Sequence, residues 1–442
     1  MKRLILLILL SFMYFYHVSS QVRTHYFTDG SLAGAFFDAV SANGRYVVGS
    51  HPGALMGMLF KTETGELINI TSSVENGMVS AESVSNEGVI VGLFTDPEAL
   101  SEKMKPCDVP GLYDYKEDKW TALERPEGVK NFEAGFSGNA TCISSDGKLI
   151  GGFLPTANKN YIYSGMIWNG DGSVASILPD PQKGAGAKIN SMSDDGNVSC
   201  GWREDAMYGK VTIWKDGKLL SINQEGHGTV VSQNGKYVGG NFLDGVHQMG
   251  VPFIWTEETG VVAVDYPKGI FSGEVSGISD NGRVAIGHVD FNSIVDHRPF
   301  IILDGVYYDF DEYMLSNYGI KGPEDESFFT VSSMSADGKV MCGFSLVDDA
   351  RVPWILVFDE PLSVEAKTAD LTVNVYPNPV SDILNIEGDY SSVSVYNNLG
   401  VAVSHDKDSR GHINVSNLSE GIYFVTIMKN NALRTFKVTI NH

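Results

Sequence analysis

The chain of 442 residues is poor in cysteine and in positive charge, and both shortages exclude classes of protein. Four cysteines in so long a chain cannot form a disulfide framework, and none has the C-x-x-C spacing of a zinc or redox site. The 54 acidic residues outnumber 32 lysines and arginines, which gives a formal net charge of -22. Such a surface repels phosphate backbones and anionic lipid, so we expect no nucleic-acid or membrane-surface partner. The charge can also serve only to keep the protein soluble.

The four cysteines fall into two pairs. Cys200 and Cys342 hold the same place in two copies of a repeated phrase, inside apolar runs, and are predicted to be small core residues. Cys107 is predicted to lie in a loop and Cys142 at the start of a strand. A disulfide between Cys107 and Cys142 therefore remains open for an exported chain.

Only one long apolar run is present, over residues 4–16. Two basic residues precede it and the small residues 18–20 follow it, which is the pattern of a Sec signal peptide cleaved before Gln21. A membrane helix needs about 20 apolar residues, so a membrane anchor is the weaker alternative, and we expect no transmembrane segment. Residues 1–20 are thus predicted to be a signal peptide that directs the chain out of the cytoplasm.

One short phrase recurs seven times: an apolar residue, serine, any residue, then Asp, Asn or Glu, glycine, and an apolar run that ends in a second glycine. The serines lie 39 to 59 residues apart and are Ser41, Ser85, Ser144, Ser193, Ser232, Ser279 and Ser335. That spacing matches one four-stranded propeller blade and is too irregular for a stacked solenoid.

Each phrase predicts a β-hairpin, because its Asn-Gly, Asp-Gly or Glu-Gly supplies the positive φ of a tight turn and its serine can hydrogen-bond the turn. We therefore expect these serines and acids to be structural rather than catalytic. A second phrase supplies two more strands, for example residues 165–168 and 174–178. The aromatic residue that ends the third strand is predicted to pack between blades rather than to bind a ligand. Four strands in each of seven units predict an all-β, seven-bladed β-propeller.

The seventh unit lacks a fourth strand, because its pattern stops at Pro361. Residues 25–28 precede Ser41 by about the distance that separates a fourth strand from the next phrase elsewhere. We expect this N-terminal strand to pair with the last blade and close the ring, which removes an exposed edge. The propeller is thus predicted to occupy residues 21–360.

The paired phrases resemble the extracellular HAF-type repeats of bacterial secreted proteins over residues 35–358. This resemblance implies a secreted propeller. Members of the repeat class share no single activity, so it implies nothing about a substrate.

The composition changes after a polar linker at residues 361–370, and short alternating strands with Gly and Asn turns fill residues 371–442. This alternation predicts a small, Ig-like β-sandwich. The segment resembles the type A C-terminal sorting domain of the type IX (Por) secretion system of Bacteroidetes. The residues that carry the resemblance are Tyr376, Pro377, Asn378, Pro379, Gly400, Gly421 and Lys437.

The second resemblance implies passage through the periplasm and the outer membrane, recognition by the type IX machinery, and cleavage near the linker with release or attachment to surface lipopolysaccharide. We therefore expect a monomer that is secreted or held at the outer cell surface. An ordinary accessory sandwich is the alternative, because length and alternation alone are common.

The connections after the repeat glycine vary between blades, and variable loops on one face are where repeat proteins carry function. Five of these connections combine an aromatic residue with a carboxylate. The candidate ligand-binding residues in them are Asp96, Trp202, Glu204, Asp205, Asp244, His288, Asp290 and Asp349. Together they could stack a sugar and accept its hydroxyl hydrogen bonds, or hold a cation. The alternative is that the aromatic residues plug the channel and the acids are solvated.

The densest titratable group is His288, Asp290, Asp296 and His297, and His51 holds the first-blade position that matches His288. Their spacing fits no metal motif, so we expect no cofactor and leave metal binding open. Two functions remain: a noncatalytic binding protein for glycan or protein ligands, and a hydrolase or lyase that acts on polysaccharide or peptide. The absence of a nucleophile motif such as G-x-S-x-G favours the first.

Overall fold

The chain folds into two units, residues 1–363 and residues 364–442, and each is described by itself. The computed structural model describes residues 22–442 except for 101–103, 127–137, 156–162, 180–185, 204–208, 221, 223, 247–249, 292–295, 363–372, 389, 391, 398–402, 404–405, 408–411 and 430–431. The predicted signal peptide and most of the predicted linker therefore lie outside the described residues. Within the described ranges, no helix has the length and apolar character that crossing a membrane requires.

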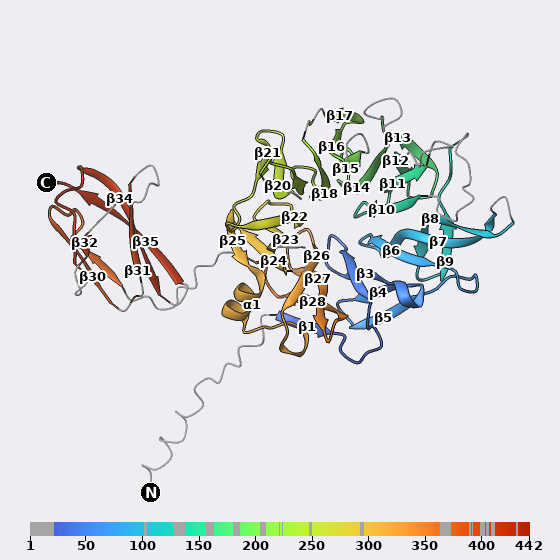
Figure 1. Cartoon of the computed structure of the whole chain (residues 1–442), viewed down its shortest axis with the longest axis horizontal. Coiled ribbons are helices and arrows are strands. Elements are labelled where there is room, and N and C mark those ends of the chain that lie inside the picture. The colour runs from blue at the N-terminus through green and yellow to red at the C-terminus, as the bar shows by residue number, and fades with distance from the viewer. Residues whose placement is uncertain are drawn as a thin grey trace, which may run out of the picture. The chain divides into compact units, whose positions relative to one another are not determined.

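Seven four-stranded antiparallel sheets, the blades, form the first unit (Figure 1). Blades 1 to 3 contain β2 (Phe36–Val40), β3 (Tyr46–His51), β4 (Met56–Lys61), β5 (Glu66–Ile70), β6 (Val79–Val84), β7 (Val89–Leu100), β8 (Pro106–Asp114), β9 (Lys119–Ala122), β10 (Asn139–Ile143), β11 (Leu149–Pro155), β12 (Tyr163–Asn169) and β13 (Val174–Ile177). Blades 4 and 5 contain β14 (Ala187–Met192), β15 (Val198–Arg203), β16 (Lys210–Lys215), β17 (Lys218–Leu220), β18 (Gly226–Val231), β19 (Val238–Phe242), β20 (Val251–Thr256) and β21 (Gly260–Ala263).

Blade 6 contains β22 (Ile270–Ile278), β23 (Val284–Phe291), β24 (Asp296–Leu303) and β25 (Val306–Asp309). Blade 7 combines β26 (Phe328–Met334), β27 (Val340–Val347) and β28 (Ala350–Phe358) with β1 (Val22–Tyr26). The helical segments are η1 (Pro52–Ala54), α1 (Phe310–Tyr318) and η2 (Pro323–Asp325). This unit is the seven-bladed β-propeller that the repeats predict.

The blades close into a ring through their first strands. Contacts run from β2 to β6, β6 to β10, β10 to β14, β14 to β18, β18 to β22, β22 to β26, and from β26 back to β2. These seven strands surround the centre, and the fourth strands lie on the outside (Figure 1). β1 pairs antiparallel with β28, with Val22 opposite Phe358 and Tyr26 opposite Trp354. Blade 7 thus holds strands from both ends of the unit, and β1 covers an edge of β28 that would otherwise be exposed.

The repeat serine fixes the first hairpin of every blade. Each of the seven serines is at most 1% exposed, and its hydroxyl accepts a hydrogen bond of 3.0–3.1 Å from the backbone N–H four or five residues on. In six blades the hydroxyl also donates to the Asn or Asp two residues on, at 2.7–3.0 Å. The glycine that follows has a φ between 68° and 85°, which a residue with a Cβ adopts only at a cost. The predicted structural role of these serines is confirmed.

Third-strand aromatic residues pack between the blades, as predicted. Trp168 and Trp214 are at most 1% exposed, and their indole N–H groups donate to the carbonyls of Glu124 at 2.8 Å and Pro179 at 3.2 Å. A buried indole with a satisfied N–H offers no platform to a ligand.

The four cysteines are free and buried, so the disulfide between Cys107 and Cys142 does not form in this structure. The predicted loop position of Cys107 is wrong, because this residue lies in β8. Burial raises the pKa of the Cys142 thiol to about 12, which keeps it protonated and unreactive. Cys200 and Cys342 are core residues, as predicted.

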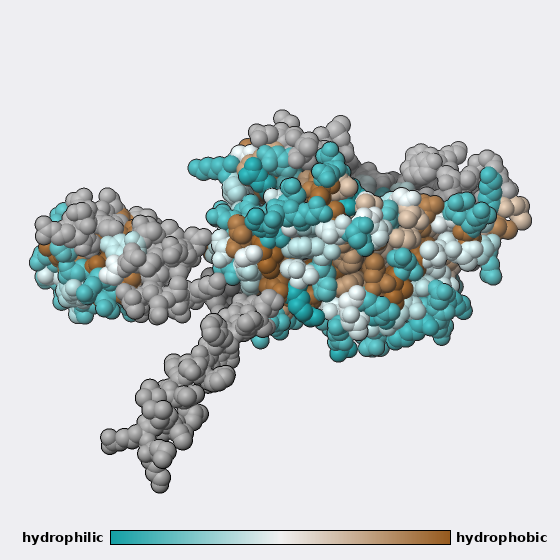
Figure 2. Space-filling model, turned by 90° about the horizontal axis from the view of Figure 1, so that it is seen from below, coloured by the Kyte–Doolittle hydropathy of each residue, from teal (hydrophilic) through white to brown (hydrophobic). Residues whose placement is uncertain are grey.

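The helix α1 was not predicted. The side chain of Asp309 caps it by accepting a hydrogen bond from the Glu312 N–H at 3.0 Å, and Gly319 ends it with a φ of 69°. Phe310 and Met314 bury one face of the helix in the hydrophobic core that blades 6 and 7 share. On the surface shown in Figure 2, the described hydrophobic residues lie in separate patches among hydrophilic ones.

The second unit is a β-sandwich, as predicted. One sheet has the order β29 (Asn374–Tyr376), β30 (Ile383–Glu387), β33 (His412–Asn414) and β32 (Asp406–Lys407). The other has the order β31 (Ser392–Asn397), β34 (Gly421–Lys429) and β35 (Ala432–Ile440). Leu384 and Ile413 from the first sheet pack with Val425 and Val438 from the second, and this core holds the sheets together.

Candidate functional site

A cavity of about 290 Å³ lies where blades 1, 6 and 7 meet at the centre of the propeller. Its wall comes from β2, β22 and β26 and from the strands that follow them in blades 6 and 7. The lining residues are Asp38, Glu274, Ser276, His288, His297, Phe329, Thr330, Val331, Ser332 and Phe344. Two carboxyl groups, two imidazoles and two phenyl rings thus share one small space, which makes this the candidate functional site.

A second hollow, of about 660 Å³, lies on the hairpin turns of blades 3 and 4 and is more open to solvent. Its acids already serve the turns: Asp146 accepts a hydrogen bond from Ser144, and Asp194 accepts one from Ser145. Because these carboxylates hold the backbone in place, we do not assign a ligand to this hollow.

Each blade places one polar side chain at a β-bulge in its first strand. In all seven blades the register of the first hairpin skips one residue, three positions before the repeat serine. The skipped residues are Asp38, Glu82, Thr141, Asn190, Thr229, Ser276 and Ser332. In blades 3 to 6 this side chain donates to a backbone carbonyl of the next blade: Thr141 to Ile189, Asn190 to Gly228, Thr229 to Val275 and Ser276 to Val331. The bulge residue therefore ties neighbouring blades together.

Blades 1 and 2 depart from this pattern, because their bulge residues, Asp38 and Glu82, carry a carboxyl group in place of a hydroxyl or amide donor. Glu82 instead accepts hydrogen bonds from Ser80 and, at 3.1 Å, from Asn139 of blade 3. Asp38 lines the cavity. A position that is structural in four blades thus carries a carboxyl group at the candidate site.

Three strands of blade 6 present side chains to one another at the site. Asp290 on β23 lies opposite Ser272 on β22 and opposite His297 on β24, and His288 lies opposite Glu274. Because residues two apart on a strand share a face, His288 and Asp290 lie on the same side of the sheet. Antiparallel pairing over three strands therefore brings together residues that are up to 25 positions apart in the sequence.

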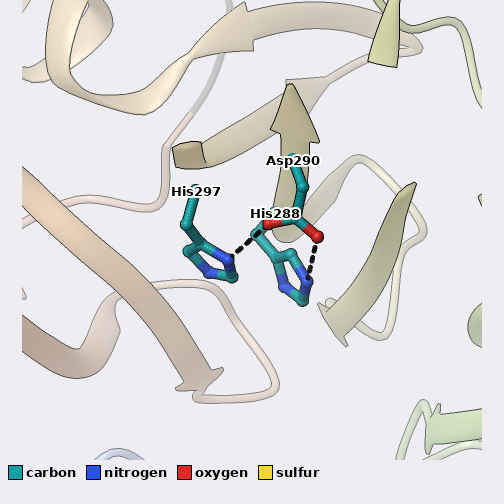
Figure 3. Close-up of side chains that lie close together, drawn as sticks. All are labelled: His288, Asp290 and His297. Carbon is teal, nitrogen blue, oxygen red and sulfur yellow. Dashed lines mark hydrogen bonds and ion pairs between the residues drawn. The ribbon is translucent and has the colours of Figure 1, made fainter. Parts of the chain in front are cut away.

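Asp290 is the centre of this group, and it is 4% exposed. Its Oδ1 lies 2.7 Å from His297 Nδ1, and its Oδ2 accepts a hydrogen bond from the Ser272 hydroxyl. His288 Nε2 lies 4.0 Å from Oδ2, and Figure 3 shows both imidazole rings turned toward the carboxylate. Among the described residues, neither ring nitrogen of His288 has a hydrogen-bond partner. Glu274 is held from the other side by His227 of blade 5, with Nε2 3.2 Å from Oε2.

A run of stacked rings extends from this group into blade 7. The rings of His288 and His297 lie 4.0 Å apart, those of His297 and Phe329 4.7 Å, and those of Phe329 and Phe344 5.5 Å, all stacked. The Arg351 guanidinium lies 5.0 Å from the centre of the Phe344 ring. The cavity wall therefore combines flat π surfaces with acceptors for hydrogen bonds.

The surroundings shift the pKa values of the ionisable groups at the site in different directions. Burial, together with the negative charge of Glu82, raises the pKa of Asp38 well above its usual value, although Arg351 opposes this. Burial also acts to raise the pKa of Glu274, but the hydrogen bond from His227 and the nearby imidazoles outweigh it and the pKa is lowered. Burial lowers the pKa of His288, which favours its neutral form. At neutral pH the cavity thus pairs an ionised Glu274 with a carboxyl of Asp38 that resists ionisation.

Burial would likewise raise the pKa of Asp290, but the hydrogen bonds from His297 and Ser272 prevail and the pKa is lowered. Asp290 is therefore an ionised carboxylate in a nearly closed environment. Such a group needs compensating donors or a cation.

Among the predicted ligand-binding residues that the structure describes, it brings together His288 and Asp290. Asp96 lies in β7 and Trp202 in β15, and neither lines the cavity. Asp244 is exposed in the connection after β19, and Asp349 is exposed in a turn. Glu204 and Asp205 lie outside the described residues, so their part of the prediction stays open.

The prediction that these residues belong to loops is wrong for several of them. The second strands of blades 2 and 6 run on to Leu100 and Phe291, so that Asp96, His288 and Asp290 are strand residues. Asp296 pairs with Arg298 at 3.1 Å, and His51 ends β3; neither lines the cavity.

Sequence reasoning missed Asp38, Glu274, Phe329 and Phe344. A signal for the first of them was present, since aligning the seven copies on the repeat serine puts Asp38 in the column of Thr141 and Ser276. No such signal marks Phe329 and Phe344, because their place at the site depends on how blade 7 packs against blade 6.

In the second unit, the motif residues join the two ends of the sandwich. The Asn378 side chain donates to the Lys437 carbonyl at 2.8 Å and accepts from the Thr439 N–H at 2.9 Å. The Tyr376–Pro377 and Asn378–Pro379 peptide bonds are cis. Gly421 begins β34 with a φ of 151°, and Gly400 lies outside the described residues.

Comparison with known proteins bears on both units. Residues 374–441 match the family described as secretion system C-terminal sorting domain, so the tail is the type IX sorting domain that its motifs indicate. No curated protein matches the chain by sequence.

Solved structures with a similar fold include the hydrazine synthase of Kuenenia stuttgartiensis (TM-score 0.44, 14% identity, 73% of this chain and 96% of that chain). Others are the β-propeller domain of Cps50 (Swd1) of Myceliophteria thermophila (0.38, 11%, 75% and 99%) and a catalytically inactive virginiamycin B lyase of Staphylococcus aureus (0.41, 11%, 76% and 99%). At these values the similarity says nothing about activity, and the propeller is established by the sheets and ring contacts described above.

Proposed function

We propose that this chain, which the type IX secretion system exports by means of its C-terminal sorting domain, is a noncatalytic glycan-binding protein. In this proposal, the cavity between blades 1, 6 and 7 holds the terminal sugar of a neutral glycan. The observation that carries the proposal is the run of stacked rings from His297 to Phe344 beside the carboxyl groups of Asp38 and Glu274. Flat π surfaces accept the C–H face of a sugar, and carboxylates accept its hydroxyl protons.

The size and charge of the cavity limit the range of sugars that it can bind. A volume of about 290 Å³ is at the low end of ligand sites, which commonly span about 300–1,000 Å³, so the site suits one sugar unit rather than a chain. Among the described residues, no lysine or arginine lines the cavity, whereas Asp38 and Glu274 do. Sulfated, phosphorylated or uronic sugars should therefore bind poorly.

A glycan array with the full chain tests this proposal. We expect binding to neutral terminal sugars, a loss of at least about tenfold in affinity for Phe329→Ala and for Glu274→Gln, and no change for Glu98→Gln on β7, which does not line the cavity. Absence of binding to every glycan would refute the proposal and leave a protein ligand as the alternative.

A hydrolase or lyase acting on polysaccharide is the second candidate. It is favoured by the opposite pKa shifts of Asp38 and Glu274, since a protonated and an ionised carboxyl group at one cavity could act as acid and base. His297 adds a second possibility, because a carboxylate at Nδ1 orients an imidazole for proton transfer at Nε2. Release of reducing ends from a bound polysaccharide, reduced about 10²–10⁴-fold by Glu274→Gln, would establish this candidate in place of the first.

A second part of the proposal concerns the mature form of the protein, and it rests on the predicted signal peptide and on the sorting domain. We propose that residues 1–20 are removed as a signal peptide, that the sorting domain is cut off within residues 361–370, and that the propeller is then released or held at the outer cell surface of a Bacteroidetes bacterium. Support comes from the apolar run before Gln21 and from the sorting domain itself. Mass spectrometry of the exported protein would test this; an N-terminus other than Gln21, or a retained sorting domain, would contradict it.

A further inference from the structure

We propose that His288, Asp290 and His297 form a binding site for one divalent transition-metal ion, of the zinc class, in the wall of the central cavity. The three residues each offer one ligand atom, and these atoms all lie within 4.8 Å of one another. Ligands about 2.0–2.2 Å from a tetrahedral zinc ion lie about 3.3–3.6 Å from one another, so rotations of the side chains would have to bring the three ligand atoms to that separation. His297 Nδ1 and His288 Nε2 lie 2.7 Å and 4.0 Å from the Asp290 oxygens, one distance below and one above this separation, and the ion would replace the 2.7 Å hydrogen bond.

The backbone holds the three residues in place. His288 and Asp290 are two residues apart on β23, and His297 lies opposite Asp290 on β24, near the end of the regular antiparallel pairing of these two strands. Sites built on paired strands keep their geometry better than sites on loops. Phe329 stacks on His297 from the neighbouring blade and limits the movement of that ring.

Other contacts around the three residues match what a metal site requires. The Ser272 hydroxyl donates to Asp290 Oδ2, which orients the carboxylate. His288 has no hydrogen-bond partner among the described residues, so a ring nitrogen is free to bind an ion. The side chains of Asp290 and His297 are 6% and 14% exposed, so water competes weakly for the ion.

The ligand set selects the class of metal. Two imidazoles and one carboxylate suit zinc, iron, cobalt, nickel or copper, whereas calcium and magnesium prefer oxygen ligands alone. Three protein ligands also leave coordination positions open. Because His288 and His297 line the cavity, those positions would face the space in which a ligand sits. The ion could thus contact a sugar hydroxyl directly, although the metal site does not depend on glycan binding.

Metal binding can be measured without any glycan. The full chain, purified without a polyhistidine tag and treated with a chelator, is titrated with Zn²⁺ by calorimetry and with Co²⁺ by visible absorption. We expect one saturable site per chain. His288→Gln, His297→Gln and Asp290→Asn should each weaken binding by at least about 100-fold, and Ser272→Ala by about 10–100-fold, since outer partners of metal ligands have effects of that size.

Two controls keep the result decisive. His442→Gln, in the other unit, should leave the affinity unchanged, which separates the site from weak binding over an acidic surface. His288→Gln removes a partly exposed residue without a hydrogen bond, so it should fold even if Asp290→Asn does not; melting curves in chelator check this. The proposal is overturned if no stoichiometric binding occurs, or if His288→Gln and His297→Gln bind as the wild type does. Glycan arrays on the chelated protein report on the proposed function separately.

Discussion

The two ends of each blade's first hairpin differ in how closely they follow the repeat. At the turn, all seven blades use a buried serine, a positive-φ glycine and the same hydrogen bond to the second strand. At the β-bulge, the side chain donates a hydrogen bond to the next blade in blades 3 to 6. In blades 1 and 2 the same position carries a carboxyl group. The turn is uniform because every blade forms the same hairpin. The other end differs between blades, and in blades 1, 6 and 7 it lines the cavity that we propose binds a ligand.

The largest expected effect comes from opening the ring. Deleting residues 21–30 removes β1, its five backbone pairs with β28 and the buried Val22. We expect a loss well above about 3 kcal/mol in the free energy of unfolding, with aggregation through the exposed edge of β28. Thermal melts measure this; deleting residues 364–442, which form a separate unit, should leave the propeller transition in place. An unchanged melting temperature after the N-terminal deletion would show that ring closure contributes little.

A turn substitution should have a smaller effect. Ser279→Ala leaves the buried N–H of Val284 without its side-chain acceptor, which should lower stability by about 1–3 kcal/mol. The exposed Ser316 of α1 is the matched control, and its change to alanine should be neutral or slightly stabilising. Equal effects in urea titrations of the two variants would contradict a special role of the repeat serine.

Placing a hydrogen-bond donor at the bulge position of blade 1, as in blades 3 to 6, should stabilise the protein and weaken glycan binding. Asp38→Asn supplies a donor like Asn190 and removes a partly buried carboxyl group whose ionisation is disfavoured, so we expect a gain of about 1 kcal/mol at pH 7 together with loss of glycan binding.

This substitution should also change the response to pH. The folded-state pKa of Asp38 lies above its unfolded value, so its contribution to stability is full below about pH 4 and is lost as the pH rises through the folded-state pKa. Melting temperatures from pH 4 to 8 should therefore fall less steeply for Asp38→Asn than for the wild type. Asp359→Asn, at an exposed position, should follow the wild type, and parallel curves for all three proteins would argue against a perturbed Asp38.

The smallest effect is expected in the tail. Asn378→Ala removes two hydrogen bonds that join the motif to β35, but the side chain is exposed, so the sandwich should lose only about 1 kcal/mol. Ser381→Ala is a nearby exposed control. The amount of exported protein, measured in culture medium and in cell fractions, should fall for Asn378→Ala and not for Ser381→Ala. Equal export of the two variants would show that the secretion system recognises the motif independently of these hydrogen bonds.

The sequence predicts the architecture well because the same local chemistry recurs. Seven serine and glycine turns and the apolar strands after them need no long-range information, and Tyr376 to Pro379 mark the tail in the same way. The helix α1 could also have been predicted, because Asp309 with Glu312 forms a capping pattern and Gly319 ends it.

The site could be predicted only in part. His288, Asp290 and His297 stand out because they are close in the sequence, whereas the neighbours of His297 at the cavity are set by packing between blades. Asp244 and Asp349 do not line the cavity, because a shared place in the repeat does not bring exposed connections of different blades together. The position of a residue in the repeat predicts the strand in which it lies. Packing between blades determines which side chains meet at the cavity.

The position of β28 has a mechanical consequence for export. The chain leaves the propeller just after this strand, which has β27 on one side and β1 on the other. Tension transmitted through the sorting domain would therefore act on a strand bonded along both edges, and it would have to break two ladders at once rather than peel one away. A propeller attached in this way resists unfolding by a force that is applied through its C-terminal end. We therefore expect the propeller to stay folded while the sorting domain is pulled during export.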